Sequence, residues 1–169
     1  RARFSPEETV VSIRASEAID AALRATVDDG DEVLVPDPSY VSYAPCVELC
    51  GGKAVSVPCR AEDGFVLTPE AVERAVTDRT KILIFPYPNN PTGGIMTRAA
   101  VEALIPVVLK HDLLILADEI YAELTYGGSH VSAASFPALK DRVVLVSGFS
   151  KAFAMTGWRI GYVAAPGEI

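Results

Sequence analysis

The amino-acid sequence predicts an α/β fold in which helices cover both faces of a mostly parallel sheet. Along its 169 residues, short runs rich in β-branched residues alternate with segments of helical periodicity, a pattern typical of βαβ units. The runs "KILIF" and "LLILA" are continuously apolar, as expected of strands that are buried on both faces. We therefore expect three layers, α/β/α, around a seven-stranded sheet.

The strands of this sheet are expected where apolar, β-branched runs are bounded by turn residues. They span Thr9–Ile13, Glu32–Pro36, Lys53–Pro58, Lys81–Phe85, Leu113–Ala117, Arg142–Ser147 and Ile160–Ala164. Only a tight, glycine-rich connection separates the last two strands, which leaves no room for a crossover helix. The last strand is therefore expected to be antiparallel.

Four helices are expected between these strands. They span Ser16–Val27, Tyr40–Leu49, Pro69–Val76 and Arg98–His111. Ser16 is a candidate N-cap of the first helix, and Thr68 precedes Pro69 as the cap of the third. The turn sequences "DDG" and "GG" are expected to end the first two helices.

The composition limits the classes of partner. The net charge of −7 argues against general binding to nucleic acids or anionic membranes, because both require basic surfaces. No apolar run approaches the roughly 20 residues of a membrane span. Cys46, Cys50 and Cys59 stand without a histidine pair, which favours buried thiols over a metal site or a disulfide. We expect a cytoplasmic protein without a bound metal.

Polar segments follow the predicted strands or open the helices after them. They are "RASEA" after Ile13, "PDPSY" after Val35, "PYPNNPTGG" after Phe85, "ADEIY" after Leu116 and "SGFSK" after Val146. Taken alone, Ser16 could only cap its helix, Asn90 could only make a turn before Pro91, and Asp118 could only cap the turn that follows. Together they should converge on the carboxyl edge of the sheet, where doubly wound folds bind ligands.

The chemistry of these groups suits a phosphorylated aromatic ligand. A helix N-terminus at Ala15–Ser16, together with a serine hydroxyl and an arginine, can hold a phosphate. Tyr40 offers an aromatic face on which a flat ring can stack. Asp118, directly after a buried strand, needs a cationic partner to stay ionised, and a protonated pyridine nitrogen is such a partner.

The remaining groups indicate an oxygen and an aldehyde on the same ring. Asn90 and Tyr121 can donate hydrogen bonds to a phenolate oxygen. Lys151 can form an imine with an aldehyde if desolvation and a nearby cation such as Arg159 lower its pKa. Phosphate, pyridinium, phenolate and aldehyde together describe pyridoxal 5′-phosphate.

Four motifs resemble those of the class I/II aminotransferases of pyridoxal-phosphate fold type I, the aspartate-aminotransferase-like proteins. The motifs are "PDPSYVSY", "YPNNPTGG", "ADEIYAELTY" and "SGFSKAFAMTGWRIGY", in the order and spacing of that family, and the resemblance covers the whole chain. It implies the major domain of a pyridoxal-phosphate-dependent transferase. It also implies transfer of an amino group between an amino acid and a 2-oxo acid.

The resemblance also implies a role for each matched residue. Lys151 would be the Schiff-base lysine and the base that moves the proton, and Asp118 would pair with the pyridine nitrogen. Tyr121 and Asn90 would bind the 3′-oxygen of the ring, with Asn90 also reaching the substrate carboxylate. The other cofactor contacts would be Tyr40 stacked on the ring and, at the phosphate, Arg159, Ser150 and the backbone of Ala15–Ser16. Trp158 is expected to pack beneath the phosphate loop.

Two positions depart from the family pattern. "RAS" stands where the family commonly reads Gly-Ala-Ser, so Arg14 either crowds the phosphate or adds a cation to it. Gly148 stands where some members carry a phosphate-binding serine, which places more weight on Ser150.

We expect residues 1–169 to be the incomplete large domain of a longer protein, without the N-terminal arm and the C-terminal small domain of the family. The resemblance implies a homodimer whose partner subunit completes the site, so the fragment alone should be a poor catalyst. Other functions stay open. A carbon–sulfur β-lyase would use the same cofactor residues, an aminotransferase-like domain fused to a DNA-binding module would be a regulator, and a truncated remnant would be inactive.

Overall fold

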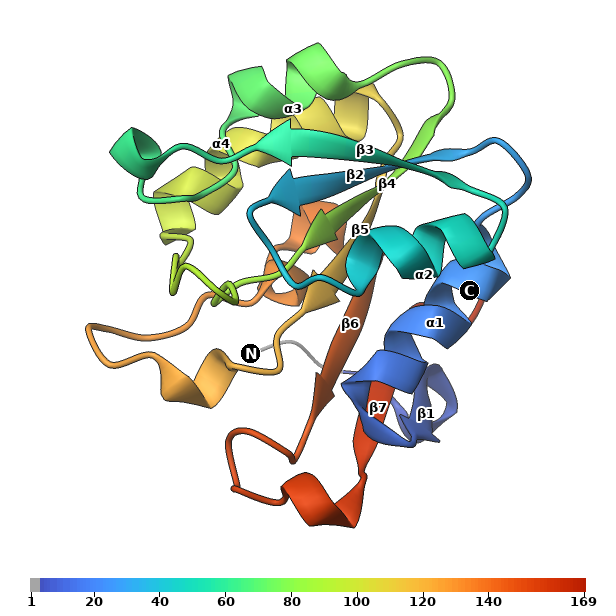
Figure 1. The fold of residues 1–169 in the computed structure, drawn as a ribbon, viewed down its shortest axis with the longest axis vertical. Helices are drawn as coiled ribbons and strands as arrows, with labels where there is room; N and C mark the ends of the chain where they lie inside the picture. The colour runs from blue at the N-terminus through green and yellow to red at the C-terminus, as the bar shows by residue number, and fades with distance from the viewer. Residues whose placement is uncertain (1–3) are drawn as a thin grey trace.

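A single seven-stranded sheet forms the centre of the structure, a computed structural model that describes residues 4–169 (Figure 1). The strands are β1 (Thr9–Ser12), β2 (Glu32–Asp37), β3 (Lys53–Pro58), β4 (Thr80–Phe85), β5 (Leu114–Asp118), β6 (Val143–Gly148) and β7 (Gly161–Ala164). They lie in the order β1-β7-β6-β5-β4-β2-β3. The pairs from β6 through to β3 are parallel, whereas β7 is antiparallel to both of its neighbours. The predicted sheet, with its antiparallel last strand, is confirmed.

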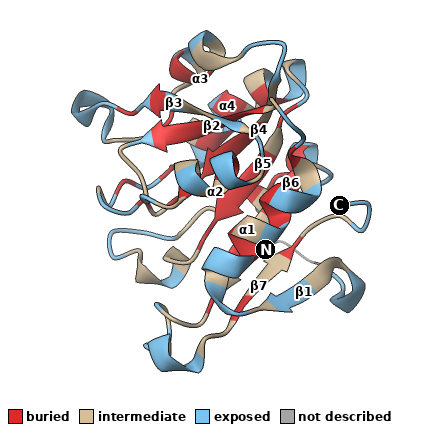
Figure 2. Cartoon of the chain, turned by 45° about the vertical axis from the view of Figure 1, so that its right-hand side comes forward, coloured by how far each residue is buried: buried red, intermediate tan, exposed pale blue. Residues whose placement is uncertain are grey.

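Helices cover both faces of this sheet, which confirms the three predicted layers. They are α1 (Arg14–Thr26), α2 (Tyr43–Leu49), α3 (Pro69–Ala75) and α4 (Arg98–Lys110). Successive residues of a strand pack under different helices: Leu83 of β4 belongs to the core that includes α3 and α4, and Ile82 and Ile84 to the core that includes α1 and α2. The central strands are accordingly buried on both faces (Figure 2).

Two predicted helix starts are wrong. α1 begins at Arg14, and Ser16 is not its N-cap, because the chain turns into the helix directly after β1. The side chain of Glu17 instead accepts a hydrogen bond from the backbone N–H of Ile13. α2 begins at Tyr43, so Tyr40 lies in the turn before it. The cap at Thr68 is confirmed, since its hydroxyl accepts a hydrogen bond of 3.2 Å from the N–H of Ala71.

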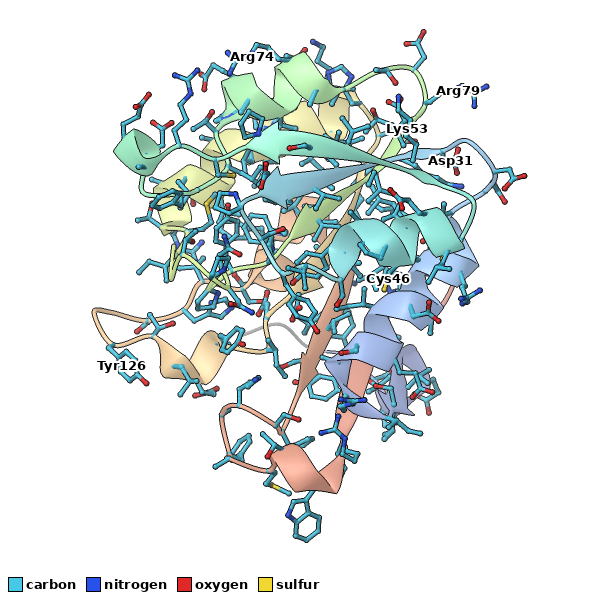
Figure 3. All side chains as sticks on the ribbon, in the orientation of Figure 1. Asp31, Cys46, Lys53, Arg74, Arg79 and Tyr126 are labelled. Carbon is cyan, nitrogen blue, oxygen red and sulfur yellow. The ribbon has the colours of Figure 1, made fainter. Side chains whose placement is uncertain are left out.

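The edge at which β2 and β4–β6 begin carries charged residues in compensating pairs. The acidic turn before β2 is tied to β4 by Lys81, whose Nζ donates to Asp31 at 3.1 Å and Asp28 at 3.3 Å. Lys53, labelled in Figure 3 at the start of β3, pairs with Glu32 at 2.8 Å. Within residues 4–169, no cluster of histidine, cysteine and acidic side chains could hold a metal ion, and no helix is long and apolar enough to cross a membrane.

The opposite edge gathers the carboxyl ends of the parallel strands. Ser12, the last residue of β1, pairs with Gly161, and Gly161 pairs in turn with Gly148 at the end of β6. The first turn of α1 therefore starts at the same edge as the loops that follow β2, β4, β5 and β6. This arrangement brings five separate segments of the chain together.

Gly161 permits this close approach. A Cβ atom at that position would lie 2.3 Å from the carbonyl carbon of Arg14 and 2.5 Å from the backbone nitrogen of Ala15. Both are backbone atoms of the first turn of α1, which cannot move aside like the end of a flexible side chain. A side chain at Gly148 would likewise meet the carbonyl oxygen of Ile160 at 2.9 Å, which explains why serine is not accommodated there without a shift.

Gly161→Ala is therefore expected to lower the free energy of unfolding by about 1–3 kcal/mol, because the added methyl group forces α1 away from β7. Gly127→Ala is the matched control, since nothing lies within 4 Å of its added carbon. Urea denaturation of both variants of the full-length protein measures the difference. Equal stability of the two would show that the start of α1 does not depend on this contact.

Candidate functional site

A cavity of about 220 Å³ opens at the carboxyl edge of the sheet. All of the residues predicted from the sequence to bind a cofactor or act in catalysis line it: Ala15, Ser16, Tyr40, Asn90, Asp118, Tyr121, Ser150, Lys151 and Arg159. They come from the first turn of α1, the turn before α2, and the segments that follow β4, β5 and β6. The structure thus brings the predicted residues into one place, and their individual roles stay predictions.

Asp118 is the most deeply buried charged group of this cavity. It is the last residue of β5 and is 6% exposed. Its Oδ2 accepts a hydrogen bond of 2.7 Å from the hydroxyl of Tyr43, and its Oδ1 accepts one of 3.2 Å from the backbone N–H of Ile120. The second bond shows that Asp118 does cap the following turn. Each carboxylate oxygen accepts one hydrogen bond and has the capacity to accept another from a ligand.

The charge of Asp118 is not compensated within the described residues, where it forms no ion pair. Burial raises the pKa of this carboxyl group above its ordinary value, and the hydrogen bonds from Tyr43 and Ile120 oppose that shift. A cation bound beside Asp118 would favour the ionised form. The cavity therefore offers a place for a positively charged group.

Tyr43 was not among the predicted site residues. It lies in the first turn of α2, is 2% exposed, and packs edge-on against Tyr40 with ring centroids 5.6 Å apart. Burial and then the charge of Asp118 raise the pKa of Tyr43 well above its ordinary value, so the hydroxyl keeps its proton and donates it. The three-residue spacing from Tyr40 was the available signal, since it places both tyrosines on one face of the predicted helix, but the sequence analysis gave a role to Tyr40 alone.

Arg159 provides an anion site at another side of the cavity. Its Nη1 donates to the carbonyl oxygen of Thr156, while its Nη2 is buried and has no hydrogen-bond partner among the described residues. Because an unpaired buried guanidinium nitrogen is costly, this group points to a missing anionic partner. The first turn of α1 at Ala15–Ser16, whose N–H groups favour negative charge, lines the same cavity.

Arg14 also lines the cavity and has a φ of 73°, in the left-handed region that is strained for a non-glycine residue. The backbone conformation here is one that glycine adopts without cost, which is the physical reason that a glycine suits this position. The side chain of Arg14 is exposed rather than buried beneath α1. The structure therefore accommodates the arginine at the cavity without filling the core.

Lys151 supplies the amine of the cavity. It follows β6 in the connection to β7, and its Nζ lies 5.7 Å from the ring centroid of Tyr121. Ser150, beside it, lines the same cavity, whereas Ser147 faces the carbonyl oxygen of Glu119 at 3.5 Å and does not line it. The prediction for Trp158 is wrong: the indole is 68% exposed at the end of a short turn and is not packed beneath the phosphate loop.

Pyridoxal phosphate fits this set of groups. The unpartnered nitrogen of Arg159 suits its phosphate, and the uncompensated carboxylate of Asp118 suits its protonated ring nitrogen. Tyr40 provides an aromatic side chain and Lys151 provides an amine, and both residues line the same cavity. The lining residues to which the sequence analysis gave no role are Ile19, Tyr43, Pro88, Ile120 and Thr156, and all of them except Ile19 lie within the four motifs.

Relatives of known sequence support the same identification. The family model for aminotransferase class I and II matches residues 1–169. The chain is 47% identical over 164 residues to the putative aminotransferase YugH of Bacillus subtilis (strain 168), covering 96% of this chain and 42% of that protein. It is 44% identical over 165 residues to the aspartate/prephenate aminotransferase of Thermus thermophilus, covering 98% and 42%.

A solved structure gives the same result for the fold. The aromatic aminotransferase from Pyrococcus horikoshii OT3 superposes with a TM-score of 0.95 at 44% sequence identity, over 98% of this chain and 45% of that one. The chain thus spans less than half the length of the relatives that it matches. Enzymes of this family use pyridoxal phosphate. From its fold, its cavity and a family match along its entire length, this chain belongs to the class I and II aminotransferases.

Proposed function

We propose that the full protein is a pyridoxal-phosphate-dependent aminotransferase that moves an amino group between an amino acid and a 2-oxo acid. One observation carries this proposal above the others. A single cavity combines a buried carboxylate without a cation, a buried guanidinium nitrogen without an anion, and an amine. When bound there, pyridoxal phosphate supplies an aldehyde that captures amino groups and a ring that accepts electrons.

The residues at the two charged ends of the cavity would bind and orient the cofactor. Arg159, Ser150 and the first turn of α1 would hold its phosphate through charge-assisted hydrogen bonds. Asp118, kept in place by Tyr43 and Ile120, would hold the ring nitrogen in its protonated form. Tyr40 would stack on the ring, while Asn90 and Tyr121 would donate to the oxygen on it.

Lys151 would act at its Nζ atom. Its amine would hold the cofactor at the aldehyde and, when free, would take up and return a proton. The ring centroid of Tyr121 lies 5.7 Å from the same Nζ, within the range of a cation–π contact. Lys151, Asp118 and Tyr121 are therefore the proposed catalytic residues, with the other lining residues serving to bind the cofactor.

The substrates are proposed only as a class. The relatives are named for aspartate, prephenate, aromatic amino acids and N-acetyl-LL-diaminopimelate. These compounds share an amino or oxo group beside a carboxylate but differ in their side chains. We propose an amino acid and a 2-oxo acid as the substrate pair, bound between this cavity and parts of the protein outside residues 1–169.

We further propose that residues 1–169 are the large domain of a cytoplasmic homodimer, with an N-terminal arm and a small C-terminal domain elsewhere in the protein. Large exposed side chains occur on the segments that follow β5 and β6, near the cavity. Tyr126, Phe153 and Trp158 are 92%, 59% and 68% exposed, and Tyr126 projects outward from its loop (Figure 3). Such apolar surface is typical of an interface.

Lys151→Ala tests the covalent attachment. Full-length protein loaded with pyridoxal phosphate is reduced with borohydride, and peptide mass spectrometry is expected to place the cofactor on Lys151 in the wild type and nowhere in the variant. Lys140→Ala removes an exposed lysine outside the cavity and should keep full labelling. Labelling of Lys151→Ala at another residue with wild-type yield would contradict the assignment.

Asp118→Asn tests the electronic role of the carboxylate. The amide keeps an acceptor for Tyr43 but carries no charge, so kcat/KM is expected to fall about a hundredfold or more. Asp20→Asn, on the outer part of α1, is the control and should be neutral. Activity of Asp118→Asn within about threefold of wild type, less than ~1 kcal/mol, would exclude the role.

The same variant has an expected effect on the cofactor-free protein. Because burial raises the pKa of Asp118, ionisation costs folding free energy once the pH exceeds the unfolded value of about 4. The stability that this group contributes is complete below that pH and is lost as the pH rises through its folded pKa. Asp118→Asn should therefore be more stable than wild type at neutral pH and equal to it in acid, as urea titrations at several pH values will measure.

Sedimentation of the full-length protein at micromolar concentration tests the proposed assembly. A dimer is expected, because the exposed aromatic side chains near the cavity would be buried by a second copy. A monomer that turns over substrate at the full rate would exclude a site shared between subunits. A dimer in which a mixture of two inactive variants regains activity would support it.

A further inference from the structure

We propose that Tyr43 is a positioning residue for the cofactor ring: its hydroxyl fixes one oxygen of Asp118 and its aromatic ring fixes Tyr40. The carboxylate that meets the ring nitrogen and the side chain that stacks on the ring would then be held as one unit. This inference rests on the proposed function, because it assumes that pyridoxal phosphate binds in the cavity. It adds a residue that lies within the motif "PDPSYVSY" but to which the sequence analysis gave no role.

The contact between Tyr43 and Asp118 joins two elements that are 75 residues apart in the sequence. The donor hydroxyl stands 2.7 Å from Oδ2, and the two residues are only 2% and 6% exposed. The ring of Tyr43 belongs to the core shared with Val47 and Ile84, so the side chain cannot turn its hydroxyl toward solvent without disrupting that core. The bond is therefore a fixed part of the cavity wall.

Removal of this hydroxyl would change the protonation of Asp118. The carboxylate would keep a single donor, the N–H of Ile120, and its burial would favour the neutral form more strongly. The other ionisable groups that line the cavity are Tyr40 before α2, Tyr121 after β5, Lys151 and Arg159 before β7, and Arg14 in α1, and the charge of the neighbouring Glu119 also acts on Asp118. None of them forms an ion pair with Asp118 in the described residues.

A pair of ligands separates this effect from a general loss of packing. Pyridoxal phosphate carries a ring nitrogen that can be protonated, whereas its carbocyclic analogue carries a C–H group at that position and is otherwise the same. Only the first ligand needs an ionised Asp118. A residue that acts through Asp118 must therefore change the affinity for pyridoxal phosphate and leave the affinity for the analogue alone.

The experiment measures the dissociation constants of both ligands with full-length, cofactor-free wild type and Tyr43→Phe. We expect Tyr43→Phe to bind pyridoxal phosphate about tenfold more weakly and the analogue with unchanged affinity. Loss of pyridoxal phosphate affinity on acidification should also begin at a higher pH in the variant, because protonation of Asp118 becomes easier. This pH dependence is a readout that a purely structural role of Tyr43 would not move.

Tyr87→Phe is the matched control. Tyr87 is 1% exposed, lies in the core on the other face of the sheet, and its hydroxyl accepts a hydrogen bond of 2.8 Å from the N–H of Leu67. The control loses an equally buried hydroxyl and should be destabilised without a change in the ratio of the two affinities.

Each outcome is decisive. Equal weakening of both ligands by Tyr43→Phe, or no weakening of either, would overturn the inference while leaving the proposed cofactor in place. Wild-type protein that binds neither ligand, or that binds both equally at every pH, would overturn the proposed role of Asp118 and this inference with it. Selective weakening of pyridoxal phosphate supports both.

Discussion

Burial of the Asp118 carboxylate at the end of the central strand β5 is the constraint on which the rest of the site depends. A charge in that position is costly without a cation, and the described residues supply only neutral donors, Tyr43 and the backbone of Ile120. These donors orient the group without neutralising it. A positively charged group of a ligand would balance the charge of Asp118. The buried, unpartnered guanidinium nitrogen of Arg159 is the opposite case, because it would be balanced by a negatively charged group.

The sheet brings these opposite charges together without placing them in contact. The parallel strands β4 and β5 end at the same edge, which places the loop with Asn90 beside Asp118. Because β7 is antiparallel and begins at that edge, Arg159, just before β7, lies there too. Close contact between Gly161 and α1 then adds the helix start to the same wall. Asp118 is held by the backbone of β5, which is already paired in the sheet, so its carboxylate needs little reorganisation when a ligand arrives.

Most of the fold could be predicted from local patterns, because the continuously apolar strands and the caps at Thr68 and the glycine turns are encoded by neighbouring residues. The start of α1 could not, since it follows from a left-handed Arg14 and the contact with Gly161, which no local pattern reports. Tyr43 was missed for a related reason. Its partner lies 75 residues away, and a buried tyrosine in a helix is indistinguishable in sequence from an ordinary core residue. Trp158 is the opposite case to Tyr43: it was expected to be packed because it is large and apolar, and it is exposed.

The connection between β6 and β7 has a consequence for the motion of this region. It carries both Lys151 and Arg159, with short turns and few regular hydrogen bonds between them. A ligand bonded to the first and paired with the second would cross-link the two ends of the segment 151–159 and close it into a ring. The conformational entropy of the segment would then fall. A ligand in the cavity would in this way also restrict Phe153 and Trp158, whose exposed side chains lie on the same segment.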